Sequence, residues 1–358
     1  MKKILFIIGS LGGGGAERIV TTIASYLSET NNYDVSILTY YSAKNEYQYS
    51  SKIKRINISQ GDKEAYLNMS LIKKISQIRK KINLISPDEI LCFLPHPLVL
   101  TYFALFFSKL RKRIIYAERA NPKKDSSKIG KIKNIIVKKI KKIFTQNEGQ
   151  KAFYNSICKT PVAVIPNPVY RELLMKEKKY SKVPRKVVSV GRLCDQKNFE
   201  LGILAIYELR KQNIDVELYI YGNGNKKGKL LELTRKLCIE RHIYFMGYEE
   251  DRSKIYGDKD IFLMTSKFEG MPNTLAEAMC YGVPVVSTNC EYGVSDLIFD
   301  EKMGVLLKDF EVGTVVKELK SIIINYKKYV DRAIIAKEVL ANKFSYEKIM
   351  NLWHEQLK

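Results

Sequence analysis

Cysteine is too scarce and too scattered in this sequence to build a framework. Only six of the 358 residues are cysteine, no two of them are spaced as C-x-x-C, and there are only three histidines. We therefore expect neither a disulfide scaffold nor a structural zinc site. Reduced thiols suit the cytoplasm, where we expect the protein to reside.

Long apolar runs are also missing. The first run follows Met1-Lys-Lys and ends within six residues in a glycine cluster, without a small-residue cleavage site, so it predicts a buried strand and not a signal peptide. The most apolar stretch, residues 90–107, is interrupted by Pro95, His96 and Pro97, which predicts a strand, a turn and a helix. Neither run reaches the about 20 apolar residues that a membrane span needs.

Acidic residues are scarce in the first half of the chain. Residues 1–170 hold 29 Lys or Arg against 11 Asp or Glu, whereas the remainder holds 32 against 27. This asymmetry predicts an anionic partner for the first half: nucleic acid, anionic lipid or a phosphorylated substrate. No nucleic-acid module is present, so we expect no nucleic acid. A general preference for lysine is the alternative, but it leaves the balanced second half unexplained.

Two runs of alternating strands and helices predict two α/β domains. The first occupies residues 1–168 and the second residues 169–341, and a helix over residues 342–358 is expected to cross back to the first domain. Between the domains, Ile165-Pro166-Asn167-Pro168 predicts an extended connection. We expect two doubly wound parallel sheets whose carboxyl ends face a shared cleft, because ligands bind at that end of such sheets.

The segment richest in chemistry runs from Ser266 to Ala278 and reads SKFEGMPNTLAEA. It predicts a strand end, a tight loop and a helix capped by Asn273. The unpaired N–H groups and positive dipole at a helix start suit a diphosphate. A carboxylate repels phosphate, so we expect Glu277 and Glu269 to accept hydrogen bonds from ribose and sugar hydroxyls. A plain strand, loop and helix with a solvated glutamate is the alternative.

A second junction of strand and helix carries two cations. It reads Gly191-Arg192-Leu-Cys-Asp-Gln-Lys197-Asn198. Arginine binds phosphate as a planar fork and lysine as a point charge, so Arg192 and Lys197 together suit a leaving diphosphate. Taken alone, such a segment is more often a pair of surface cations.

A glycine loop follows the first strand and reads Gly9-Ser-Leu-Gly12-Gly13-Gly14-Gly15-Ala-Glu17. No register fits G-x-G-x-x-G, and no G-K-[ST] follows, so neither nucleotide signature applies. We expect the loop to let a substrate approach the backbone closely. The D-x-D sequence at Asp258 and Asp260 precedes a strand, faces away from the expected cleft and is not expected to bind metal.

Isoleucines at spacings of three and four, with lysines between them, predict a basic amphipathic helix from Lys128 to Ile143. Such a helix suits the surface of an anionic membrane. The alternative is that the isoleucines pack on the sheet and the lysines are solvated.

These motifs together resemble the retaining glycosyltransferase family 4, which has the GT-B fold. The resemblance rests on Gly191-Arg192 with Lys197-Asn198, on the E-x7-E pair Glu269 and Glu277, and on the glycine loop. It covers essentially the whole chain. One departure is Arg119, because many family members carry a histidine at the corresponding place.

The resemblance implies a role for each motif. The C-terminal domain is expected to hold a nucleotide diphosphate sugar, with Glu269, Arg192 and Lys197 as the catalytic residues. Donor-binding residues are expected to be Gly191, Gly270, Met271, Asn273, Thr274, Leu275 and Glu277. Acceptor-binding residues are expected to be Gly13, Gly14, Glu17, Glu118 and Arg119. Family members retain the anomeric configuration and need no divalent metal or other cofactor.

Within the family, the chain is similar to bacterial enzymes that extend polyprenyl-diphosphate-linked glycans for surface polysaccharides such as O-antigen or capsule, or for protein glycosylation. This implies a UDP-sugar donor such as UDP-N-acetylgalactosamine, an α-linkage, and a protein peripherally bound to the inner face of the cytoplasmic membrane. A GT-B-type UDP-sugar epimerase is the alternative enzyme. It releases UDP without an acceptor.

Overall fold

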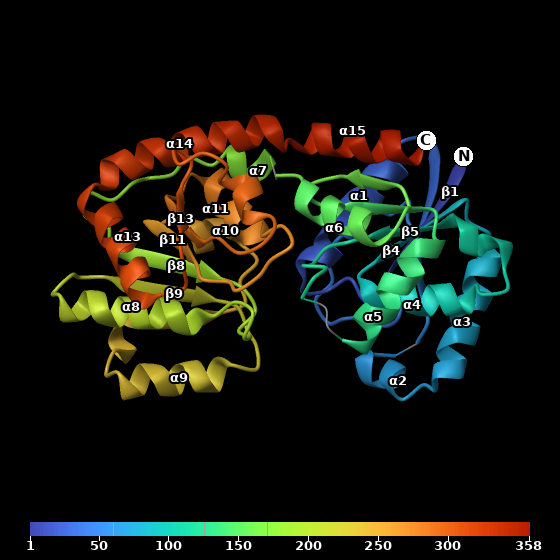
Figure 1. Ribbon diagram of the computed structural model, residues 1–358, viewed down its shortest axis with the longest axis horizontal. Coiled ribbons are helices and arrows are strands. Elements are labelled where there is room, and N and C mark those ends of the chain that lie inside the picture. Colours follow the sequence, from blue (N-terminus) through green and yellow to red (C-terminus); the bar gives the residue numbers. More distant parts are fainter. Residues whose placement is uncertain (60, 125–126, 170) are drawn as a thin grey trace. The chain divides into compact units, whose positions relative to one another are not determined.

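The chain folds into two compact α/β units, which we describe separately. The computed structural model describes residues 1–59, 61–124, 127–169 and 171–358. The N-terminal unit comprises Met1–Asn167 and Ile349–Lys358, and the C-terminal unit comprises Pro168–Lys348 (Figure 1). The last helix therefore ends on the unit with which the chain begins.

The N-terminal unit is built on a seven-stranded parallel sheet in the order β3-β2-β1-β4-β5-β6-β7. The strand order reverses between β1 and β4. Its strands are β1 (Lys2–Ile8), β2 (Tyr33–Thr39), β3 (Lys54–Asn57), β4 (Glu89–Phe93), β5 (Ile114–Ala117), β6 (Lys142–Thr145) and β7 (Val162–Val164). Its helices are α1 (Gly15–Glu29), α2 (Lys63–Leu67), α3 (Leu71–Ile85), α4 (Pro95–Ala104), α5 (Lys128–Ile136) and α6 (Glu148–Ile157), with short 3-10 turns η1 (Lys109–Arg113) and η2 (Val137–Lys139).

The C-terminal unit repeats this design with six parallel strands in the order β10-β9-β8-β11-β12-β13. Its strand order reverses between β8 and β11. The strands are β8 (Lys186–Val190), β9 (Glu217–Tyr221), β10 (Ile243–Gly247), β11 (Ile261–Met264), β12 (Val285–Thr288) and β13 (Val305–Leu307). The helices are α7 (Arg171–Leu174), α8 (Phe199–Lys211), α9 (Lys227–Lys236), α10 (Arg252–Tyr256), α11 (Asn273–Tyr281), α12 (Val294–Leu297), α13 (Val312–Ile324) and α14 (Tyr326–Lys343), with a 3-10 turn η3 (Glu240–His242).

Both faces of the first sheet are covered, which explains why β1 is a continuous apolar run and not an alternating one. Leu5 and Ile7 join the core beneath α3, α4 and α5. Phe6 lies on the opposite face and stacks on Phe93, with ring centres 5.9 Å apart. Successive residues of a strand point to opposite faces, so both faces need apolar side chains here. The two doubly wound parallel sheets predicted from the alternation are therefore confirmed.

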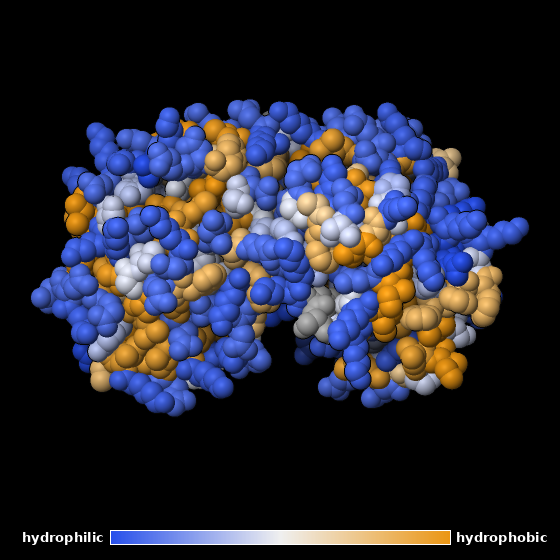
Figure 2. Space-filling model, viewed as in Figure 1, coloured by the Kyte–Doolittle hydropathy of each residue, from blue (hydrophilic) through white to orange (hydrophobic). Residues whose placement is uncertain are grey.

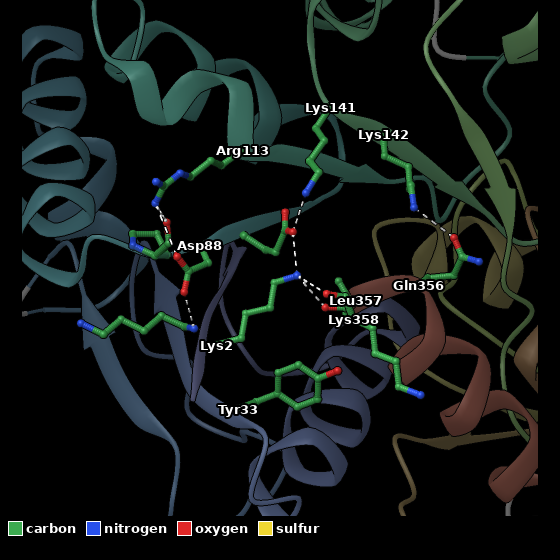
Figure 3. Close-up of polar contacts among 12 residues, drawn as sticks. Lys2, Tyr33, Asp88, Arg113, Lys141, Lys142, Gln356, Leu357 and Lys358 are labelled. Carbon is green, nitrogen blue, oxygen red and sulfur yellow. Dashed lines mark hydrogen bonds and ion pairs between the residues drawn. The ribbon is translucent and has the colours of Figure 1, made fainter.

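Helix α15 (Tyr346–Leu357) carries the end of the chain onto the first sheet. Trp353 is fully buried, and its ring lies 5.1 Å from that of Phe144 at a steep angle. The Lys2 ammonium donates hydrogen bonds to the carbonyls of Leu357 and Lys358, at 2.8 and 3.0 Å (Figure 3). A cation at this position satisfies the last carbonyls of the helix and complements its dipole.

The single basic helix predicted from Lys128 to Ile143 is wrong. Helix α5 ends at Ile136, η2 follows, and Ile143 lies in strand β6. Ile136, Ile140 and Ile143 belong to the core of the unit, and even Lys133 is fully buried. The isoleucine stripe therefore packs on the sheet, which was the alternative interpretation of this segment.

The interrupted apolar stretch at residues 90–107 forms strand β4 and helix α4, as predicted. The turn predicted at Pro95, His96 and Pro97 is wrong, because these residues form the first turn of α4. Among the residues that the structure describes, no helix has both the length and the hydropathy to cross a bilayer.

Candidate active site

Two loops meet where the strand order of the second sheet reverses, between the neighbouring strands β8 and β11. The Lys267 N–H donates to the Gln196 carbonyl, and the Gln196 amide donates to the Phe268 carbonyl, both at 2.8 Å. The Thr265 hydroxyl donates to the Asn198 carbonyl at 2.9 Å. These bonds fix the β8–α8 loop against the β11–α11 loop at the edge where α/β sheets bind ligands.

An ion pair joins the two loops. The Lys197 ammonium lies 2.7 Å from Glu269 Oε1, and the two side chains are 17% and 8% exposed. The aliphatic part of Lys197 lies over Gly191, where an added Cβ would stand 3.1 to 3.3 Å from its carbons. The structure thus brings Gly191, Lys197 and Glu269 together, because β8 and β11 are neighbouring strands.

Arg192 lies beside this pair but is differently placed. Its side chain is exposed, and it has no hydrogen bond or ion pair with any residue that the structure describes. A guanidinium in this state keeps its five donors for an external anion.

The start of helix α11 differs from the prediction in one respect. Asn273 is not the helix cap, because Pro272 occupies that position and Asn273 is the first helical residue. None of the side chains that the structure describes caps the helix. The Thr274 hydroxyl is inaccessible to solvent and has no hydrogen-bond partner among the described residues. Leu275 and Met271 are buried, so they fix the loop and helix start to the core.

Glu277 follows Asn273 by one turn of α11 and is buried. The Tyr256 hydroxyl donates to Glu277 Oε2 at 3.1 Å, and Arg252 Nε lies 3.1 Å from the same oxygen. Both partners come from helix α10. Neither partner could be expected from the sequence, because α10 is a five-residue helix with no motif of its own.

Gly293 is a further residue that the sequence analysis missed. It has a φ of +78°, and a Cβ there would lie 2.1 Å from the Gly270 carbonyl oxygen. The loop after β12 therefore packs directly on the backbone of the β11–α11 loop, and only glycine allows this approach. A glycine just beyond a predicted strand was the signal that could have revealed it.

In the N-terminal unit, the glycine loop follows β1. Gly13 has a φ of +83° and is exposed. The Glu17 carboxylate is folded back over Gly14, where a Cβ would lie 2.0 Å from Glu17 Oε2. A carboxylate in the first turn of α1 complements the positive end of the helix.

Glu118 follows β5 and is engaged within the protein. Its Oε1 accepts hydrogen bonds from the N–H groups of Arg119 and Ala120 at 2.9 and 3.0 Å. Its Oε2 accepts a bond from the Tyr154 hydroxyl at 2.6 Å and lies 3.3 Å from the ammonium of Lys133. Glu118 and Lys133 are each 1% exposed, so this carboxylate holds the loop in place from inside.

Arg119 is enclosed by aromatic rings. Its guanidinium carbon lies 5.3 Å from the ring centre of Phe93 and 5.4 Å from that of Trp353. Its Nη1 donates to Asn167 Oδ1 at 3.0 Å. Burial lowers the pKa of Arg119 to about 10, although the negative charge of Glu118 opposes this shift. Arg119 therefore connects the loop after β5 with Asn167 and with Trp353 of helix α15.

The C-terminal unit matches the family described as glycosyl transferases group 1 over residues 170–339. A glycosyltransferase of Haemophilus influenzae, described as uncharacterized, is 28% identical over 362 residues, with 99% of each chain covered. The C-terminal unit is a group 1 glycosyltransferase domain, and the protein is a glycosyltransferase. The two joined loops, with Arg192, Lys197 and Glu269, lie within the residues of the glycosyltransferase that match the family.

Two further similarities are informative. An enzyme of Campylobacter jejuni is 26% identical over 314 residues, covering 86% of this glycosyltransferase and 85% of its own length. Its name describes an α-1,4-N-acetylgalactosaminyltransferase acting on an undecaprenyl-diphosphate-linked oligosaccharide. The structure of Anabaena HepE in complex with UDP and glucose has a TM-score of 0.80, 18% identity, and covers 100% of this chain and 99% of its own. That likeness establishes the GT-B fold, and none of these matches favours the epimerase.

Proposed function

We propose that this glycosyltransferase moves a hexose or N-acetylhexosamine from a UDP-sugar, such as UDP-N-acetylgalactosamine, to a lipid-diphosphate-linked glycan. The anomeric configuration is retained, so an α-linkage forms. The observation that carries the proposal is the pair of loops after β8 and β11. Among the described residues, they unite a guanidinium without a partner, a lysine–glutamate pair and a helix start without a side-chain cap.

The charges of these loops suit the leaving group. The acceptor hydroxyl attacks the anomeric carbon from the face that the diphosphate leaves, so the new C–O bond forms as the sugar–phosphate bond breaks. Negative charge grows on the diphosphate, where Arg192, Lys197 and the N–H groups at the start of α11 stabilise it. The leaving phosphate oxygen takes the proton of the acceptor.

The two glutamates have separate tasks in this scheme. When the donor binds, Lys197 pairs with the diphosphate and releases Glu269. Glu269 then accepts hydrogen bonds from hydroxyl groups of the donor sugar. Glu277 accepts bonds from the ribose hydroxyls, and Arg252 and Tyr256 hold its carboxylate in position. The Thr274 hydroxyl adds a donor at the start of α11.

The acceptor proposal rests on charge and on relatives. The positive charge is concentrated in residues 1–170, and a lipid diphosphate is a membrane-bound anion. The Campylobacter relative acts on such a lipid by its name. We place the enzyme on the inner face of the cytoplasmic membrane, in the synthesis of surface glycans such as lipopolysaccharide O-antigen or capsule. Exposed Lys131, Lys138 and Lys139 remain available to anionic lipid despite the shorter helix.

Nucleotide release tests the proposal. The purified protein is incubated with one nucleotide sugar at a time and detergent-solubilised polyprenyl-diphosphate glycans, with EDTA present because we propose that no metal is needed. We expect UDP to appear only when acceptor is added, and the reactive donor identifies the sugar. UDP release without acceptor, accompanied by epimerised sugar, contradicts transfer. Activity that EDTA abolishes and a divalent ion restores contradicts metal independence.

A further inference from the structure

The carboxyl-terminal ends of helices α3, α4 and α5 lie along one edge of the first sheet. Helix α4 packs between α3 and α5 (Figure 1). Helices α3 and α5 precede strands β4 and β6, and α4 lies between β4 and β5, so all three helices end near the amino ends of the parallel strands. This edge is opposite the one at which the glycine loop and Glu118 lie.

Apolar side chains are exposed at these helix ends. Leu84 of α3 and Phe107 after α4 are 82% and 87% exposed. Phe103, Phe106 and Ile135 are exposed as well. Figure 2 shows apolar side chains gathered over α3, α4 and α5 of the N-terminal unit. We call these five residues the apolar edge.

The aromatic part of the apolar edge is ordered by a cation. The rings of Phe106 and Phe107 meet edge to face, with centres 5.0 Å apart. The Arg111 guanidinium lies over Phe106 and over Tyr102, at 5.3 and 5.4 Å from their ring centres. Arg111 also donates to the Phe106 carbonyl at 2.9 Å. The rings are thus held at the surface by contacts of their own.

The charge around the apolar edge has one sign. Residues 71–85, 94–113 and 127–141 contain 15 Lys or Arg and no Asp or Glu. Lys80, Lys112, Lys138 and Lys139 are exposed beside the apolar residues. Helices α8, α9 and α13, in the C-terminal unit, each carry glutamate among their basic residues.

Two carboxylates at the amino end of strand β4 are paired with cations, as Figure 3 shows. Asp88 accepts a hydrogen bond from the Lys3 N–H at 2.9 Å and pairs with Arg113 at 3.7 Å. Glu89 is buried and pairs with Lys2 and Lys141, at 3.1 and 2.5 Å. No uncompensated negative charge among the described residues of this edge opposes an anionic surface.

We propose that the apolar edge docks on an anionic phospholipid bilayer, with the Phe106 and Phe107 rings inserted and the lysines on the headgroups. An apolar centre within a basic surface is the pattern of proteins that lie on membranes, and each cation near an anionic leaflet strengthens binding by roughly fivefold. This deepens the proposed function and rests on it, because a lipid-linked acceptor is presented at such a surface.

Co-sedimentation with vesicles tests the docking surface. The full chain is mixed with vesicles of phosphatidylcholine alone or with phosphatidylglycerol, and the variant F106S/F107S is compared with I324S. Ile324 is 69% exposed and lies in the C-terminal unit, so it is a matched control. We expect binding only to the anionic vesicles, weakened by salt, and at least about tenfold weaker for the double phenylalanine variant alone.

A fluorescent reporter checks insertion directly. Trp353 is the single tryptophan and is buried, so F107W adds one exposed reporter and F310W supplies the control. We expect the emission of F107W alone to shift to the blue with anionic vesicles. Equal vesicle binding by F106S/F107S and the wild type, or no shift for F107W, overturns the proposal. The proposal is also overturned if the wild type forms a dimer in solution and F106S/F107S is monomeric, because a second copy of the chain would then be the partner.

The acceptor assay separates this inference from the proposed function. F106S/F107S should release UDP normally with detergent-solubilised acceptor and at least about tenfold more slowly with vesicle-embedded acceptor. Equal rates on vesicles overturn the docking surface and leave the transferase intact. If the wild type releases no UDP with either acceptor, the proposed function is contradicted. The docking surface can still be tested then, because co-sedimentation with vesicles does not require UDP release.

Discussion

The two sheets have the same strand order around β1 and β8, but charged side chains after their strands are placed differently. In the N-terminal unit, Glu118 and Arg119 are turned inward and are engaged by protein groups. In the C-terminal unit, Arg192 is exposed and unpaired among the described residues, and Lys197 and Glu269 hold each other.

The difference shows that position after a strand does not decide what a charged residue does. Burying an ion pair costs desolvation free energy, and removing only one of its partners strongly destabilises the fold. A pair at a ligand edge can exchange its partner for substrate. We therefore expect charge substitutions in the N-terminal unit to change stability and those in the C-terminal unit to change turnover.

The largest effect is expected from Lys133→Met. The substitution keeps the volume of the side chain but leaves Glu118 buried without its cation, which costs about 3–5 kcal/mol of unfolding free energy. Calorimetry should show a lower unfolding temperature for the transition of the N-terminal unit. Adding Glu118→Gln should recover part of the loss, and equal losses for single and double variants would contradict the coupling.

The next effect is expected from Lys197→Ala. It removes a cation from the leaving diphosphate, so kcat/KM should fall at least about tenfold and up to about a hundredfold. The matched control is Lys226→Ala, which breaks an ion pair of 2.7 Å with exposed Asp195 in the same unit. A control that loses as much turnover as Lys197→Ala would show that the loss is not specific to the site.

Arg192→Ala should lower activity without changing stability. We expect kcat/KM for UDP release to fall at least about tenfold as a charge contact to the transition state is lost. The melting temperature should not change, since Arg192 has no partner among the described residues. A lower melting temperature with full activity would reverse the assignment.

Glu277→Ala is expected to change both quantities. Its loss removes the ribose contact, which should lower kcat/KM at least about tenfold. It also removes the carboxylate partner of Arg252 and one of the acceptors of the Tyr256 hydroxyl, so the melting temperature should fall. Full activity in two of the three variants Lys197→Ala, Arg192→Ala and Glu277→Ala would contradict the assigned donor site.

The strands were predictable because fully buried parallel strands are continuous apolar runs. The loops after β8 and β11 were also visible, since glycine, proline and charged residues follow those runs. The pairing of Lys197 with Glu269 was not, because it depends on β8 and β11 being neighbours across 72 residues of chain. Sheet order is a tertiary property that periodicity does not contain.

Helical periodicity misled the prediction between Lys128 and Ile143. Ile140 and Ile143 continue the spacing of the helix, yet both are buried after it ends. Both interpretations of this segment left its lysines exposed, on a membrane or in solvent, whereas Lys133 is buried because Glu118, 15 residues earlier, supplies its counter-charge. A pattern of single residues cannot reveal a partner on another element.

The smallest effect is expected from Arg119→Lys. Lysine keeps the positive charge beside the rings of Phe93 and Trp353 but loses the planar fork that reaches Asn167, so about 1 kcal/mol of stability should be lost. If Arg119 acts from within the unit, kcat and the KM for acceptor should stay within about twofold of the wild type. A rise in the KM for acceptor of about tenfold without a change in melting temperature would instead place Arg119 on the acceptor, and the contrast between the two units would then fail at this residue.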